Sequence, residues 1–278
     1  MTERDSGIRF IPGSTDILIV APHGPVIDGE YQNDVRTGVI AAEVQRELGC
    51  TAVINDRFFK PKGDITKSFE KYHLDLFRID HAGKVSAYFD RIAETVKNSL
   101  KTVIVWVHGI ADDKAVSHGR EHIDQGLFAG RPERIDAFIG YGQGADPKTG
   151  ETRDRPTARQ ETVETFRDQL TAGGMTALIT RKEGANYRGR DSKRFNQWFV
   201  RQGYGFDQAE SIQLEIKEQG FRDSEENAVK SAGIIAKALL ALLRQKIEDA
   251  APVKKFCISQ GRQIPYEREL LKVFQGQI

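Results

Sequence analysis

The chain of 278 residues has 41 lysines and arginines against 40 aspartates and glutamates, a balance that gives no electrostatic reason to expect a nucleic-acid or membrane partner. Its apolar fraction of 39% is ordinary for a soluble globular protein, and its longest apolar stretches are far shorter than the about 20 residues that cross a bilayer. The N-terminal residues are too charged for a secretory signal, and two distant cysteines, Cys50 and Cys257, exclude a disulfide framework, so we expect a cytoplasmic protein.

Short β-branched runs alternate with amphipathic segments along the chain. The pattern predicts strands at residues 16–21, 51–55, 102–107, 135–140, 175–180 and 211–217. It predicts helices at residues 35–48, 85–100, 158–172 and 224–243. Strands that alternate with helices indicate an α/β fold, in which helices cover both faces of a mostly parallel sheet. We expect residues 1–250 to form a single domain, and residues 251–278 to be an appendage that packs on it or on a second copy in a homo-oligomer.

Two of the predicted strands are each followed by a histidine and a glycine. The first strand ends in the sequence APHG, which contains His23, and the third ends in VHG, which contains His108. Ligands of open α/β sheets bind beyond the carboxyl ends of the strands. A glycine there allows a sharp turn and the close approach of a ligand. The pair of histidines therefore predicts a shared metal or catalytic site.

A hydrolytic zinc ion needs about three protein ligands and an open position for water, so two histidines require a third ligand, usually a carboxylate. The carboxylates closest to His23 along the chain are Asp28, Glu30 and Asp34. Asp34 lies just before a predicted helix, where it can be either a ligand or a helix cap, since aspartate is a favoured capping residue. The residues alone leave both roles open.

The last predicted strand alternates between apolar and polar residues, and Glu215 is on its polar side. A carboxylate in the middle of a covered strand is costly unless it is paired or functional. Glu215 is therefore a candidate general base that takes a proton from a water molecule. The alternative is a structural ion pair with Lys217 or with a nearby arginine.

Arginines follow two of the predicted strands. Residues 181–194 hold six basic residues against two acidic ones, and they lie at the same edge as the histidines if the preceding strand is parallel. Arginines there can bind a substrate carboxylate through two hydrogen bonds, or they can belong to a solvated basic loop. Arg57, in the sequence NDR after the second strand, is a further arginine at this edge.

The order of these motifs along the chain resembles the N-formylglutamate amidohydrolase family, which is distantly related to zinc carboxypeptidases. The similar pieces, spread over about residues 16–245, are VAPHG, DVRTG, NDR, WVHG, ANYRGR and IQLEIKEQGFRD. Poly-γ-glutamate hydrolases have a similar histidine-glycine strand end, with an acidic residue three positions before a threonine. In this chain that spacing selects Asp34, three before Thr37, over Glu30.

The resemblance implies a three-layer α/β/α sandwich with a mixed, mostly parallel sheet. It implies that His23, Asp34 and His108 bind Zn²⁺ and that Glu215 is the catalytic carboxylate. Arginines at the same edge would act on a small anionic substrate of the acyl-amino-acid type, with Arg57 in the catalytic site and the residues Tyr187, Arg188 and Arg190 in substrate binding. The implied reaction is hydrolysis of an amide C–N bond outside ordinary protein backbones.

Two other classes of function remain open at this point. One is a hydrolase of another ester or phosphoester on a similar scaffold, and a pair of metal ions about 4 Å apart would favour it. The other is a catalytically silent binding protein. The presence of all four residues His23, Asp34, His108 and Glu215 argues against this second alternative.

Overall fold

The computed structural model describes residues 7–23, 34–58, 72, 74–99, 101–120, 132–142, 156–180 and 193–259, and only the backbone from residue 245 onward. Within these ranges one sheet has the strand order β1-β3-β2-β4-β7-β5-β6. The strands are β1 (Ile8–Ile11), β2 (Ile17–Ala21), β3 (Thr51–Asn55), β4 (Thr102–Ile110), β5 (Ala137–Gly140), β6 (Ala177–Ile179) and β7 (Ala209–Lys217).

The sheet is mixed, and its central strands are parallel. The strands β3, β2, β4 and β7 run in one direction, whereas β1 pairs with β3 and β5 pairs with β7 in antiparallel fashion. Strand β6 is parallel to β5 and therefore antiparallel to β4. The expected mixed, mostly parallel sheet is thus confirmed.

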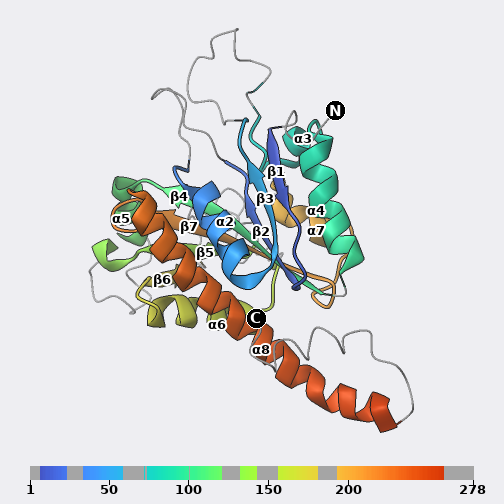
Figure 1. Cartoon of the computed structure of the whole chain (residues 1–278). Coiled ribbons are helices and arrows are strands. Elements are labelled where there is room, and N and C mark those ends of the chain that lie inside the picture. The colour runs from blue at the N-terminus through green and yellow to red at the C-terminus, as the bar shows by residue number, and fades with distance from the viewer. Residues whose placement is uncertain are drawn as a thin grey trace, which may run out of the picture.

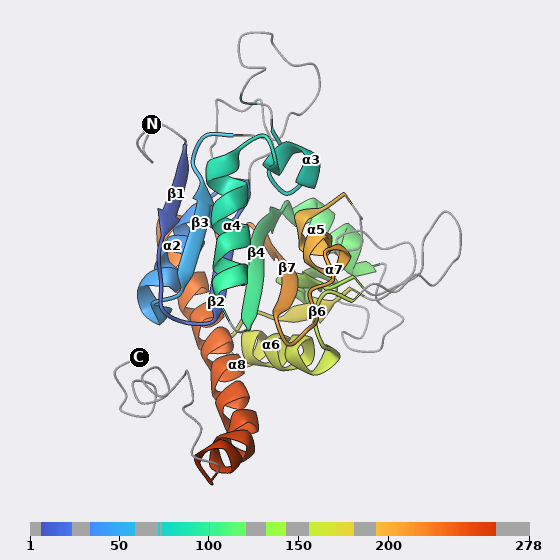
Figure 2. The same ribbon diagram turned by 90° about the vertical axis from the view of Figure 1, so that its right-hand side faces the viewer.

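Helices cover both faces of this sheet, which gives the expected three layers (Figures 1 and 2). One face carries α2 (Thr37–Leu48), α6 (Gln160–Ala172) and α8 (Glu225–Ser259), which pack on one another as well as on the strands. The other face carries α3 (Ile79–Ala82), α4 (Ser86–Asn98) and α7 (Phe195–Arg201). The helix α5 (Asp112–Arg120) and the 3₁₀ helix η3 (Pro132–Arg134) complete the described elements.

The central strands are apolar on both sides because both sides are covered. In β2, Ile17 and Ile19 belong to the core beneath α2 and α8, whereas Leu18 and Val20 belong to the core beneath α4 and α7. All five residues of β2 are buried, as is typical of a parallel strand between two helical layers. The polar residues of the site therefore lie at the edge where these strands end.

Several elements differ from the sequence-based expectation. The strand β1 and the helices α3, α5 and α7 were not predicted, because each is too short for a periodic pattern to emerge. The helix α8 continues to Ser259, beyond the expected end at residue 243. The boundary expected near residue 250 therefore falls inside a helix.

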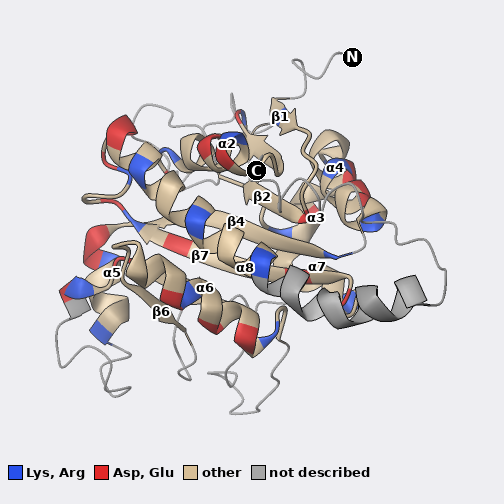
Figure 3. Ribbon diagram, turned by 60° about the horizontal axis from the view of Figure 1, so that its bottom comes forward, with Lys and Arg blue, Asp and Glu red and all other residues tan. Residues whose placement is uncertain are grey.

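The outer surfaces of the helices carry charges of both signs. Figure 3 shows basic and acidic residues mixed on α2, α4 and α6. None of the helices in the described part of the chain has an apolar stretch of the length that a bilayer crossing requires.

The packing of α8 on the sheet gives a first testable prediction. Leu239 is fully buried beneath this helix, so we expect Leu239→Ala to lower the free energy of unfolding by about 2–5 kcal/mol through lost burial and a new cavity. Val229→Ala, on the exposed side of the same helix, should change it by less than about 0.5 kcal/mol. Urea denaturation of both variants measures these changes. Equal effects would contradict the packing of α8 described above.

Candidate metal centre

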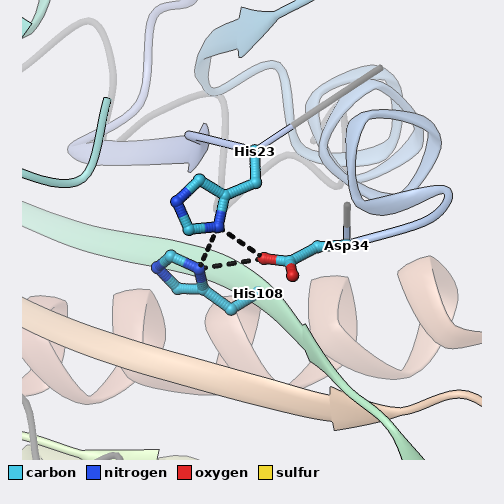
Figure 4. A group of neighbouring side chains, drawn as sticks. All are labelled: His23, Asp34 and His108. Carbon is cyan, nitrogen blue, oxygen red and sulfur yellow. Dashed lines mark hydrogen bonds and ion pairs between the residues drawn. The ribbon is translucent and has the colours of Figure 1, made fainter. Parts of the chain in front are cut away.

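His23 and His108 come from neighbouring parallel strands and lie at the same edge of the sheet. His23 follows β2 by two residues, and His108 lies near the end of β4, which is three residues longer than predicted. Both residues are buried, with 6% and 3% of their surfaces exposed. Their ring centroids are 4.8 Å apart, and both Nδ1 atoms point to the same place (Figure 4).

Asp34 completes this cluster from the segment that precedes α2. Its Oδ2 atom lies 3.0 Å from Nδ1 of His23 and 3.0 Å from Nδ1 of His108, and the two Nδ1 atoms are 3.3 Å apart. Asp34 does not cap α2, because that helix begins at Thr37 after Arg36, and no side chain caps it. Of the two roles that the sequence left open, the helix cap is therefore wrong.

Two fully buried polar side chains hold the backbone of this cluster. The hydroxyl of Thr37 lies 2.9 Å from the carbonyl oxygen of His23 and 2.8 Å from that of Asp34, so its hydrogen can be donated to either residue. The amide nitrogen of Asn55, at the end of β3, donates to the carbonyl of Pro22 over 2.8 Å. Thr37 thus helps to place His23 and Asp34, and Asn55 of the NDR motif helps to place His23.

The three ligand atoms fit a tetrahedral metal ion. Zinc bonds of about 2.0–2.1 Å to nitrogen and oxygen place neighbouring ligand atoms about 3.3 Å apart, close to the separations of 3.0–3.3 Å found here. Two imidazole nitrogens and one carboxylate oxygen are a donor set that leaves a fourth position open for water. His23, Asp34 and His108 form one group of metal-ligand type within the described residues.

A second carboxylate, which the sequence analysis missed, orients His23. Oδ1 of Asp75 lies 2.8 Å from Nε2 of His23, and its Oδ2 accepts a hydrogen bond of 2.8 Å from Arg194. With a metal ion bound, a proton held at Nε2 by this carboxylate would leave the lone pair of Nδ1 to the ion. The signal was present in the sequence, because Asp75 lies between Leu74 and Leu76, where a carboxylate is costly unless it is paired.

The cluster shifts the pKa values of the two histidines in opposite directions. Burial lowers the pKa of His23, but the charges and hydrogen bonds of Asp34 and Asp75 outweigh burial and raise it to about 9. Burial lowers the pKa of His108 to about 4, although its hydrogen bond to Asp34 acts in the opposite direction, and the charge of His23 adds to this lowering. The pKa of Asp34 lies well below its usual range, because the two histidines outweigh the effect of its burial. One proton is therefore held within the cluster near neutral pH.

Glu215 lies on the strand next to His108. The two residues are register partners of the parallel pair β4 and β7, so their side chains are on the same face of the sheet. Glu215 is 4% exposed and accepts a hydrogen bond of 2.6 Å from the amide of Gln213. Lys217, the suggested structural partner of Glu215, instead pairs with Asp136 over 2.5 Å.

Of the other predicted site residues, the structure describes Arg57. The guanidinium of Arg57 lies 5.8 Å from the ring centroid of Tyr72, and its side chain packs against Gly7. The residues Asp28, Glu30, Tyr187, Arg188 and Arg190 lie outside the described residues.

Residues 181–194 were expected at the edge of the histidines only if the strand before them is parallel to the others, and that strand, β6, is not parallel to β4. Strand β6 runs antiparallel to β4, so the carboxyl end of β6 lies at the opposite edge of the sheet. The chain reverses direction at β5, which the spacing of apolar runs did not reveal. From this stretch, the structure instead brings Arg194 to the cluster through Asp75.

No family model matches the chain, and a search of curated proteins also found no match. Among solved structures, an N-formylglutamate amidohydrolase from Ralstonia eutropha JMP134 superposes with a TM-score of 0.52 at 13% identity, over 86% of this chain and 98% of that one. A bacteriophage poly-gamma-glutamate hydrolase and a metallo-carboxypeptidase from Burkholderia cenocepacia reach TM-scores of 0.47 at 12% and 9% identity, over 86% of this chain and 89% and 61% of theirs. The chain therefore shares the fold of the amidohydrolase, as the sequence resemblance implied.

The shared proton predicts a pH dependence of the metal-free protein. His23 contributes stability that is fully present below its ordinary pKa of 6.5 and is lost as the pH rises through about 9. Asp34 contributes stability above its ordinary pKa of 3.8, which is lost as the pH falls further. We therefore expect the melting temperature of chelator-treated protein to fall between pH 6.5 and 9, and Asp34→Asn to reduce that fall.

Asp136→Asn is a matched control for this prediction, because it removes a buried carboxylate that pairs with Lys217 and not with a histidine. It should keep the fall of the wild type between pH 6.5 and 9. An equal fall in wild type and Asp34→Asn would contradict the assignment of the proton to the cluster.

Proposed function

We propose that this chain is a zinc-dependent hydrolase that cleaves an amide C–N bond outside ordinary protein backbones, such as that of an N-acyl or N-formyl amino acid. The observation that carries the proposal is the convergence of the ligand atoms of His23, Asp34 and His108 at 3.0–3.3 Å. When bound there, zinc supplies Lewis acidity for a carbonyl group and acidifies a water molecule. The shared fold with an N-formylglutamate amidohydrolase supports the choice of an amide over other bonds.

Glu215 would serve as the general base of this reaction. It lies on the same sheet face as His108, and its carboxylate would take the proton of the attacking water and pass it to the leaving nitrogen. The hydrogen bond from Gln213 fixes the orientation of this carboxylate. Because Lys217 is already paired with Asp136, an ion pair with that lysine does not account for Glu215.

His23 and Asp75 would keep the ligand set in the correct protonation state. His23 would keep its proton at Nε2, hydrogen-bonded to the carboxylate of Asp75, while Nδ1 faces the ion. The ion pair with Arg194 balances the negative charge of Asp75, so this carboxylate would not depend on the metal ion alone for a positive partner. The buried ring of Phe77 packs edge-on against that of His108, with the ring centroids 4.4 Å apart.

The substrate that we propose is a small anion of the acyl-amino-acid type. Arginine binds a carboxylate through two parallel hydrogen bonds, and the candidates that the sequence resemblance implies for substrate contact are Arg57, Tyr187, Arg188 and Arg190. A phosphoester hydrolase with two metal ions would need a second group of ligands. The group of ligand type in the described residues is that of His23, Asp34 and His108.

Zinc content tests the ligand set. Wild-type protein that is stripped, reloaded and dialysed should hold one zinc ion per chain, and His23→Ala, His108→Ala and Asp34→Ala should each lose most of it, because three protein ligands are the minimum for tight binding. Glu30→Ala should keep the zinc. His118→Ala is the matched control, because His118 is equally buried but lies beside Phe138 and outside the cluster. Elemental analysis measures the content, and equal zinc in all variants would rule out this ligand set.

Turnover on a panel of N-formyl and N-acyl amino acids tests Glu215. We expect Glu215→Gln to retain zinc and lose about 10²–10⁴-fold in kcat, because glutamine is nearly isosteric but cannot accept the proton. The KM for the best substrate should change little.

The thermal melting curve of the same variant separates catalysis from structure. A lower melting temperature with wild-type turnover would assign Glu215 to the stability of β7 and remove the proposed base. A wild type that binds zinc but cleaves no amide of the panel would favour another bond or a binding protein.

A further inference from the structure

Arg222 is a buried arginine whose guanidinium contacts main-chain carbonyls. It lies in the turn between β7 and α8, is 3% exposed, and forms no ion pair within the described residues. Its Nε donates to the carbonyl of Ile216 over 3.0 Å, one terminal nitrogen to that of Val35 over 3.2 Å, and the other to that of Ile110 over 3.1 Å. A buried cation without a carboxylate partner is costly, so these three contacts need an explanation.

The three carbonyls belong to residues beside the proposed site. Val35 directly follows Asp34, and Ile216 directly follows Glu215. Ile110 comes two residues after His108 at the end of β4. One guanidinium therefore joins the three backbone segments that carry a carboxylate ligand, a histidine ligand and the proposed base.

Gly109 makes room for this guanidinium. A Cβ atom at position 109 would lie 2.4 Å from Cζ of Arg222 and 2.7 Å from its Nε, closer than real Cβ contacts. The strand β4 continues through Gly109, so the glycine is not needed for a sharp turn there. The glycine after His108, for which we expected a turn or a ligand contact, instead accommodates the side chain of Arg222.

Arg36 makes a second hydrogen bond between the same two segments, in the opposite direction. Its guanidinium donates to the carbonyl of Arg222 over 2.9 Å, while the guanidinium of Arg222 donates to Val35, the neighbour of Arg36. Arg36 has a φ of 63°, a left-handed conformation that residues other than glycine rarely adopt. The two arginines thus hold the segment of Asp34 against the turn after β7.

We propose that Arg222, assisted by Arg36, is a positioning residue that sets the place of Asp34 relative to His108 and thereby the metal affinity of the cluster. The inference rests on the proposed function, since it requires that the cluster bind zinc. The planar guanidinium reaches three carbonyls in fixed directions, whereas a lysine ammonium is a single point charge on a flexible chain. The side-chain shape, and not the charge alone, is therefore what the site requires.

The test measures the zinc affinity of metal-free protein by competition with a chelator. We expect Arg222→Lys and Arg222→Met to weaken zinc binding by about 10–100-fold, the range that is typical when a residue supporting the ligands is removed. Glu210→Gln is the matched control, because Glu210 is a buried carboxylate at the opposite end of β7, where it accepts hydrogen bonds from Arg159 and Thr162. This control should lower the melting temperature of the metal-free protein and leave its zinc affinity unchanged.

A third variant keeps the test decisive if the Arg222 variants do not fold. Arg36→Met removes the donor to the carbonyl of Arg222 and leaves the buried guanidinium in place, so we expect a loss of affinity in the same direction. Wild-type affinity in every folded Arg222 and Arg36 variant would overturn the inference and leave Arg222 a purely structural residue. A wild type that binds no zinc would instead overturn the proposed function, so the two failures are distinguishable.

Discussion

The parallel pairing of β2, β4 and β7 is the constraint on which the site depends. Because these strands run in one direction, the segments that carry His23, His108 and Glu215 all reach the same edge of the sheet. The chain leaves β2 through α2 on one face and returns from β3 through α4 on the other, so β2 and β4 flank the point where the connections diverge. Open α/β sheets bind ligands at such a point.

Burial of charged groups at this edge is balanced locally. His23 lies between the carboxylates of Asp34 and Asp75, and Arg194 compensates the second carboxylate. The charges of Asp34, His23, Asp75 and Arg194 thus alternate along this chain of contacts, which lowers the cost of burying them. The proton of His23 occupies a place at which a cation is favourable, and a divalent ion would compete with that proton for Nδ1.

The sequence predicted what depends on local pattern and missed what depends on long-range contact. The apolar runs of β2, β4 and β7 and the histidines after the first two follow from short motifs, whereas the reversed direction of β5 and β6 leaves no periodic signal. Asp34 could not be separated from a helix cap, because a cap and a ligand occupy the same place before a helix. Asp75 and Arg222 were missed because their partners lie 52 and 187 residues away, at His23 and Val35.

X-ray absorption spectroscopy at the zinc edge of reloaded protein tests the central claim most directly, since it reports the ligand atoms themselves. The geometry of His23, Asp34 and His108 predicts a shell of nitrogen and oxygen atoms at about 2.0–2.1 Å, with the outer-shell scattering of two imidazole rings. The small fraction of zinc that His108→Ala retains should show the scattering of a single ring. A sulfur ligand at about 2.3 Å, or a spectrum that is the same in wild type and His108→Ala, would contradict the account.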